Sequence, residues 1–76
     1  MHETYREYLE HGSLRFLIIV FNEDKKYLLK IFLHRVAVYQ FPIDAPNEDA
    51  TRLSEELMAS FEKHIKTARE WVLSNY

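Results

Sequence analysis

The stretch that decides the fold is residues 14–21, LRFLIIVF, an apolar run that only Arg15 interrupts. β-Branched and aromatic side chains dominate the run, and its length is typical of a strand. As a strand it would divide its apolar side chains between two faces, with Leu14, Phe16, Ile18 and Val20 on one and Leu17, Ile19 and Phe21 on the other. A strand that is apolar on both faces is normally buried on both. We therefore predict a strand that needs cover on each side.

The segment that follows predicts the rest of a small sheet. Residues 22–25 form a polar turn, whereas the apolar side chains of residues 26–41 fit a strand period and a helix period equally well. We favour strands because residues 36–41, VAVYQF, prefer β-structure, and because a helix here would leave no room for a crossover connection. The pattern of polar residues slips at His34 and Arg35. The slip predicts a tight turn between two strands, or a bulge in one long bent strand.

The N-terminal residues 4–11 predict a short helix. Thr4 and Glu7 have the spacing of a capping box. Gly12, the only glycine of the chain, stands where a helix C-terminus favours a left-handed residue. Apolar side chains follow at helical spacing, at Tyr5, Tyr8 and Leu9.

A long amphipathic helix is predicted at the C-terminal end, to about residue 74. Asn47 can cap its start, or Pro46 can be its first residue. Its apolar stripe consists of Ala50, Leu53, Leu57, Phe61, His64 or Ile65, Ala68 and Val72. The predicted fold is a single α+β domain over residues 1–76, with the order α-β-β-β-α. It has an antiparallel sheet of two or three strands, and the long helix packs on one face.

This architecture leaves apolar surface without cover. One helix can roof only one face of the sheet, and the short N-terminal helix can hide only part of the other. Contiguous exposed apolar patches usually mark interfaces, and a 76-residue chain without cysteine often needs oligomerisation for stability. We therefore expect self-association or a larger protein partner. Edge pairing of the strand 14–21 across a two-fold axis is one route to a homo-oligomer.

Aromatic side chains are the expected anchors of such an interface. An equally good interpretation is that several of them simply close a small core. The candidates are Tyr5, Tyr8, Phe32, Tyr39, Phe41, Trp71 and Tyr76.

The sequence argues against catalysis. No two histidines stand three or four residues apart, and cysteine is absent, so no metal site is predicted. The serines lack a glycine-flanked elbow, and a single glycine cannot build a phosphate-binding loop. We expect no cofactor and no enzymatic activity. The longest apolar stretch, residues 16–21, is too short to cross a membrane, and the cysteine-free chain favours the cytoplasm.

A basic block gives the alternative function, a small regulator that binds nucleic acid. Residues 25–43 contain no acid, and Lys26 and Lys30 would alternate with Phe32 on one strand face. The expected nucleic-acid contacts are Lys25, Lys26, Lys30, His34 and Arg35. Against this interpretation stands the formal net charge of −2.

The preferred function is a non-catalytic protein–protein interaction module. It would be a small, self-associating binding or inhibitory protein that occupies the surface of a larger partner. Its size and predicted order of elements are broadly like those of small phage-encoded inhibitors of bacterial defence systems. This likeness concerns size and topology alone and involves no motif.

Overall fold

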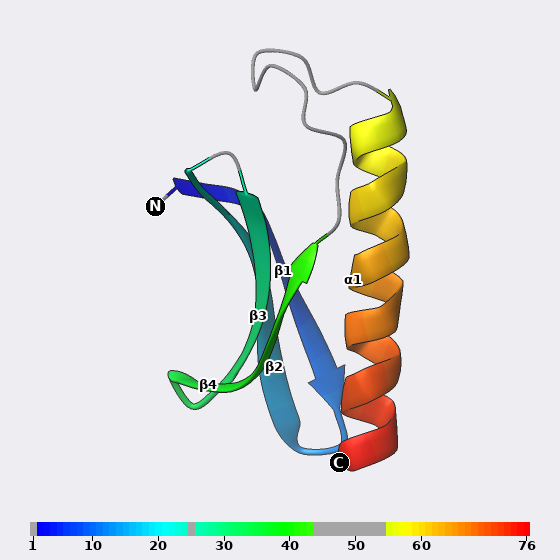
Figure 1. Cartoon of the computed structure of the whole chain (residues 1–76). Coiled ribbons are helices and arrows are strands. Elements are labelled where there is room, and N and C mark those ends of the chain that lie inside the picture. The colour runs from blue at the N-terminus through cyan, green and yellow to red at the C-terminus, as the bar shows by residue number, and fades with distance from the viewer. Residues whose placement is uncertain (1, 25, 44–54) are drawn as a thin grey trace.

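The computed structural model places the apolar run in an inner strand of a four-stranded antiparallel sheet (Figure 1). The structure describes residues 2–24, 26–43 and 55–76. The strands lie side by side in chain order. The elements are β1 (His2–His11), β2 (Leu14–Glu23), β3 (Lys26–Leu33), β4 (Val36–Ile43) and α1 (Glu55–Asn75).

The predicted N-terminal helix is wrong, because residues 2–11 form the strand β1, and the order α-β-β-β-α falls with it. Successive residues of β1 alternate between half-buried and exposed from Tyr5 to His11, which is the period of a strand. An inner strand such as β2 needs a backbone partner on both sides, and β1 supplies one of them. Thr4 does not cap a helix: its hydroxyl donates to the carbonyl oxygen of Val20 at 3.0 Å.

Tight turns join β1 to β2 and β3 to β4. Gly12 adopts a φ of 62° and Ser13 does not share it, which is the pattern of a type II′ hairpin turn between β1 and β2. The glycine that was expected to end a helix therefore begins a hairpin turn. His34 and Arg35, with φ of 51° and 67°, form a type I′ turn between β3 and β4. Of the two alternatives left open at this point, the tight turn is confirmed.

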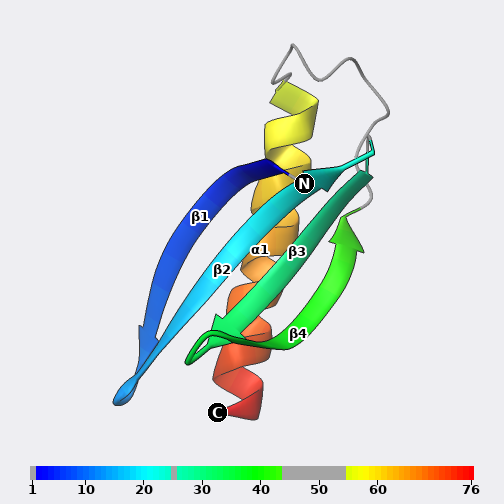
Figure 2. The same cartoon turned by 90° about the vertical axis from the view of Figure 1, so that its left-hand side faces the viewer.

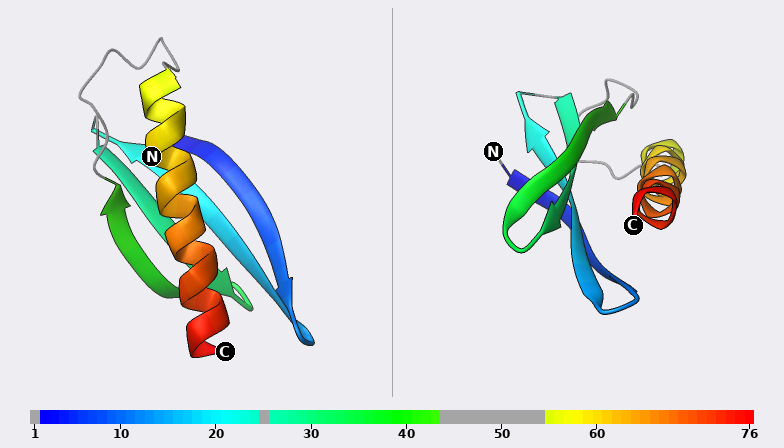
Figure 3. Two further views of the ribbon diagram at one scale, coloured as in Figure 1. Left: turned by 90° about the vertical axis from the view of Figure 1, so that its right-hand side faces the viewer. Right: turned by 90° about the horizontal axis from the view of Figure 1, so that it is seen from below.

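The helix α1 covers one face of the sheet, and the core lies between the two layers (Figure 3). Phe16, Leu29 and Val72 are fully buried there. The predicted stripe of α1 is confirmed where the structure describes it, since Leu57, Phe61, Ile65, Ala68 and Val72 are all buried. The predicted helix start at Asn47 or Pro46, and the stripe residues Ala50 and Leu53, lie outside the described residues.

The C-terminal end of α1 packs on the sheet. The ring of Tyr76 meets that of Phe16 at 4.9 Å between centroids, and Trp71 meets Tyr39 at 4.5 Å. The last turn of the helix thus helps to close the core. In the described parts of the chain, no helix has the length and apolar character needed to cross a membrane.

The position of β2 also corrects the expected route to a dimer. β2 pairs with β1 on one side and with β3 on the other. The strand that contains residues 14–21 therefore has no free edge, and the outer edges of the sheet belong to β1 and β4 (Figure 2).

Candidate functional site

The face of the sheet opposite α1 is the strongest candidate for a binding site. No described element covers it (Figure 2). The cross-strand register places one set of apolar side chains on this face, of which Ile19 is buried and the rest are half-buried. The set is Leu17, Ile19, Phe21, Leu28 and Phe32. We call this surface the open face.

Cationic side chains shield part of the open face. The guanidinium carbon of Arg15 lies 4.1 Å from the ring centroid of Tyr8, and the Nζ of Lys30 lies 5.6 Å from that of Phe21. Such cation–π contacts hold long side chains against apolar surface while their charges stay near water. Tyr8 remains 51% exposed. The open face is therefore apolar at its floor and cationic above it.

A hollow of about 640 Å³ lies on this face. Its floor contains Leu17, Ile19 and Phe32, and Tyr8 with three basic residues completes the lining: Arg15, His34 and Arg35. None of these lining residues is acidic. The hollow therefore favours a ligand that combines apolar groups with negative charge.

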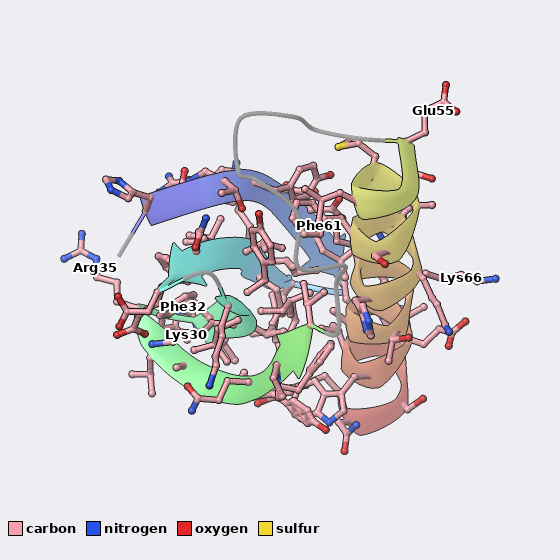
Figure 4. All side chains as sticks on the ribbon, turned by 45° about the horizontal axis from the view of Figure 1, so that its top comes forward. Lys30, Phe32, Arg35, Glu55, Phe61 and Lys66 are labelled. Carbon is pink, nitrogen blue, oxygen red and sulfur yellow. The ribbon has the colours of Figure 1, made fainter. Side chains whose placement is uncertain are left out.

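The basic end of the hollow is held by strained backbone. His34 and Arg35 both adopt positive φ, where asparagine and glycine are the usual residues of a type I′ turn. A bulky residue in this region costs about 1–2 kcal/mol, and such strain is often found at functional sites. Figure 4 shows Arg35, Phe32 and Lys30 on the side of the sheet away from α1, with Phe61 between the layers.

The structure separates the predicted aromatic anchors into two groups. Tyr8 and Phe32 lie on the open face. Tyr5, Tyr39, Phe41 and Trp71 pack against the core on the helix side, and Tyr76 contacts Trp71 there. For the second group, the closing of a small core is the interpretation that their contacts support.

Of the predicted nucleic-acid contacts, the structure brings Lys26 and Lys30 to the open face and His34 and Arg35 to its rim. Lys25 lies outside the described residues. Sequence reasoning missed Arg15, Leu17 and Ile19 as site residues. Strand parity could have found them, because they share a face of β2 and lie opposite a basic, aromatic face of β3.

A second surface lies between β1 and α1, where Arg69 ties the helix to the sheet. Its Nε and Nη2 donate to the two carboxylate oxygens of Glu7, each at 2.6 Å, and the Tyr5 hydroxyl also donates to Glu7 at 2.6 Å. The bonds from Arg69 lower the pKa of Glu7, while partial burial acts in the opposite direction. The bond to Glu7 raises the pKa of Tyr5. This network ties α1 to β1, and both carboxylate oxygens of Glu7 have hydrogen-bond partners in it.

Among residues 2–24, 26–43 and 55–76, no group of three or more histidine, aspartate or glutamate side chains could hold a metal ion. Comparison of the chain with protein-family models, with curated proteins and with solved structures found no match. A functional assignment therefore depends on the surface chemistry alone.

Proposed function

We propose that this chain is a non-catalytic protein-interaction module whose open face binds an acidic, apolar segment of a partner protein. The hollow carries the proposal. It offers an apolar floor at Leu17, Ile19 and Phe32, and it offers cations at Arg15 and Arg35 with no acid in the lining. Apolar side chains of the partner would supply affinity, and its carboxylates would supply orientation and rate of association.

A protein fits the open face better than a nucleic acid does. Single-stranded nucleic acids stack their bases on free aromatic rings. Here Leu17 and Ile19, which are aliphatic, form much of the floor, and Arg15 already lies over the ring of Tyr8. The net charge of −2 also weakens attraction to phosphate. Nucleic-acid binding is therefore the competing outcome, and labelled oligonucleotides test it.

The partner of the open face is a different protein. Two copies meeting hollow to hollow would bring Arg15 and Arg35 of one copy towards the same cations of the other. Like charges at an interface suppress the wrong partner. By occupying a surface of a larger protein, the module would act as a binding or inhibitory protein. A cytoplasmic location, which the cysteine-free sequence favours, is part of the proposal.

Selection from a random peptide library, followed by fluorescence anisotropy of the selected peptides, tests this function. We expect the immobilised protein to enrich peptides in which aspartate or glutamate neighbours leucine or an aromatic residue. Affinity should fall as salt is raised, because the contributing charges are partly exposed. A labelled oligothymidine and a labelled oligouridine serve as nucleic-acid probes under the same conditions.

Two matched variants locate the binding. The double variant Arg15→Glu/Arg35→Glu changes the hollow, and Lys63→Glu/Lys66→Glu makes the same change of charge on exposed positions of α1. We expect at least a tenfold loss of peptide affinity for the first variant and less than a twofold loss for the second. Equal losses in both variants, no enriched acidic peptide, or binding of the oligonucleotides alone would each overturn the proposal.

A further inference from the structure

The two edges of the sheet are protected to different degrees. β4 contains Pro42, whose nitrogen has no hydrogen to donate, and its register shifts opposite Ile31 and Phe32. β1 has no proline, and its one irregularity lies near its start, between Glu3 and Tyr5. From Tyr5 to His11 the register of β1 is continuous. A regular, unpaired edge of this kind is a template for another strand.

From these observations we infer that two copies of the chain pair through the free edge of β1, antiparallel and across a two-fold axis. In Figure 2 β1 forms one margin of the sheet, and no described element lies beside it. The pairing would join the two sheets into one continuous sheet, with α1 of both copies on the same side. This inference is argued from the edge of β1 and does not rest on the function proposed for the open face, although Tyr8 belongs to both surfaces.

The hairpin turn fixes which groups of β1 point outward. In a tight turn the carbonyl of His11 accepts from the N–H of Leu14, its partner in the register. Antiparallel pairs alternate between hydrogen-bonded and non-hydrogen-bonded, so His11, Leu9 and Glu7 direct their backbone groups to β2. The backbone groups of Glu10, Tyr8 and Arg6 therefore point to the free edge.

The side chains then disfavour three of the possible registers. A two-fold axis perpendicular to the sheet pairs each residue with one on the same face, so one residue of β1 must pair with itself. An axis at Glu7 sets two glutamates opposite each other, and one at Arg6 does the same with two arginines. An axis at Tyr5 sets Glu7 opposite Glu3. Like charges directly opposite each other destabilise a pair of strands.

An axis at Tyr8 is complementary. It sets Tyr8 opposite Tyr8 of the second copy, and it sets Arg6 opposite Glu10 twice, once on each side of the axis. Aromatic pairs and pairs of opposite charge are both favourable across strands. All three of these residues direct their backbone groups to the free edge, so the two strands can form ladder hydrogen bonds in this register.

Arg6 already has a partner, and this limits what its charge contributes. Its Nη2 donates to Glu3 at 2.7 Å, and both side chains are partly exposed. In the dimer, Arg6 would either leave Glu3 to pair with Glu10 of the second copy or contact both carboxylates. The charges therefore disfavour the registers centred on Tyr5, Arg6 and Glu7 and favour the one centred on Tyr8, while the backbone ladder and the tyrosine pair hold the strands together.

A groove beside β1, on the side of the sheet that carries α1, also favours a second copy at this edge. A groove of about 350 Å³ runs between β1 and α1, and Tyr5, Phe61 and Ile65 contribute to its lining. Met58, also in the lining, is 38% exposed. Both helices would lie on one side of the joined sheet, so the two grooves would face each other across the junction. Each copy would then cover the apolar side chains in the groove of the other.

Charge exchange gives a test that a purely structural effect cannot imitate. Sedimentation velocity should show a dimer of the wild type whose fraction rises with concentration. Arg6→Glu alone sets Glu10 against a new glutamate, and Glu10→Arg alone sets Arg6 against a new arginine, so each variant should be monomeric. An equimolar mixture of the two variants restores opposite charges at both positions and should form a one-to-one heterodimer. The combined variant Arg6→Glu/Glu10→Arg should again form a homodimer.

Amide hydrogen exchange of the wild type supplies a second measurement without any substitution. The amides of Arg6, Tyr8 and Glu10 should exchange at least tenfold more slowly at high than at low protein concentration, while the amides at the outer edge of β4 should not change. A wild type that stays monomeric at millimolar concentration, a mixture of variants that does not associate, or β1 amides that ignore concentration would overturn the inference. The function proposed for the open face is tested separately with the Arg15 and Arg35 variants, so failure here is distinct from failure of the proposed function.

Discussion

Relief of strain in the turn between β3 and β4 should make the protein more stable and a poorer binder. His34 and Arg35 have φ of 51° and 67°, and the variant His34→Asn/Arg35→Gly installs the residues that a type I′ turn prefers. The same substitution removes two basic side chains from the lining of the hollow. Stability and binding are thus expected to move in opposite directions.

The size of the gain follows from the backbone angles. A non-glycine residue in the left-handed region costs about 1–2 kcal/mol, and histidine is at the lower end because it tolerates this region better than most residues. Glycine gives back about 0.5–1 kcal/mol, since it has more freedom in the unfolded chain. The net stabilisation should be about 1 kcal/mol, which corresponds to a rise in Tm of roughly 4–8 °C for a domain of this size.

Urea denaturation followed by circular dichroism measures the change in stability. Fluorescence anisotropy of a selected acidic peptide measures the change in affinity. The control His34→Ala/Arg35→Ala removes the basic groups but keeps the left-handed strain, so it should lose peptide affinity without becoming more stable. An Asn–Gly variant that is less stable than the wild type would refute the reasoning on strain. One that binds the peptide as well as the wild type would refute the role of the turn in the hollow.

Three further expectations concern the fold. Gly12→Ala should destabilise the protein by about 1 kcal/mol in urea denaturation, because a φ of 62° disfavours alanine while the added methyl meets no atom within 4 Å; an unchanged midpoint would contradict the type II′ turn. Glu7→Gln should cost about 0.5–1 kcal/mol at pH 7, a modest value because Arg69 is half exposed. Since folding lowers the pKa of Glu7, this contribution is present above the unfolded pKa of about 4.3 and is lost as pH falls through the folded value, so wild type and variant should converge in acid. Leu29→Ala, in the core, should cost about 2–5 kcal/mol, whereas Leu17→Ala, half-buried on the open face, should cost about 1 kcal/mol; equal costs would indicate that the open face is covered.

The elements that could be predicted are those whose own residues determine them. The run 14–21 is too apolar for anything but an inner strand, and the stripe from Leu57 to Val72 has only one helical interpretation. Residues 4–11 fit two periods, with Tyr5, Tyr8 and Leu9 at helical spacing and Tyr5, Glu7 and Leu9 on one face of a strand. The strand forms because β2 needs a hydrogen-bonding partner on this side, and that requirement comes from the tertiary structure and not from the local propensity of residues 4–11.

The candidate site was predictable in part for the same reason. The surplus of apolar surface follows from the alternation in residues 14–21, and two half-buried side chains, Leu17 and Phe32, line the hollow on the face of the sheet that no described element covers. Which aromatic residues lie on the open face was not predictable from the sequence. Trp71 and Tyr39, for example, contact each other only because α1 packs across the sheet. The role of Arg15 depended on β1 being a strand that places Tyr8 beside it.

Chemical-shift mapping of the ¹⁵N-labelled protein with a selected acidic, apolar peptide tests the central claim most directly. The account expects the largest shifts at amides of the hollow, at Leu17, Ile19, Phe32 and Arg35, with little change on the outer side of α1 at Lys63 and Glu70. Shifts that cluster on α1, or a spectrum that does not respond to the peptide at millimolar concentration, would contradict the claim that the open face is the site of binding.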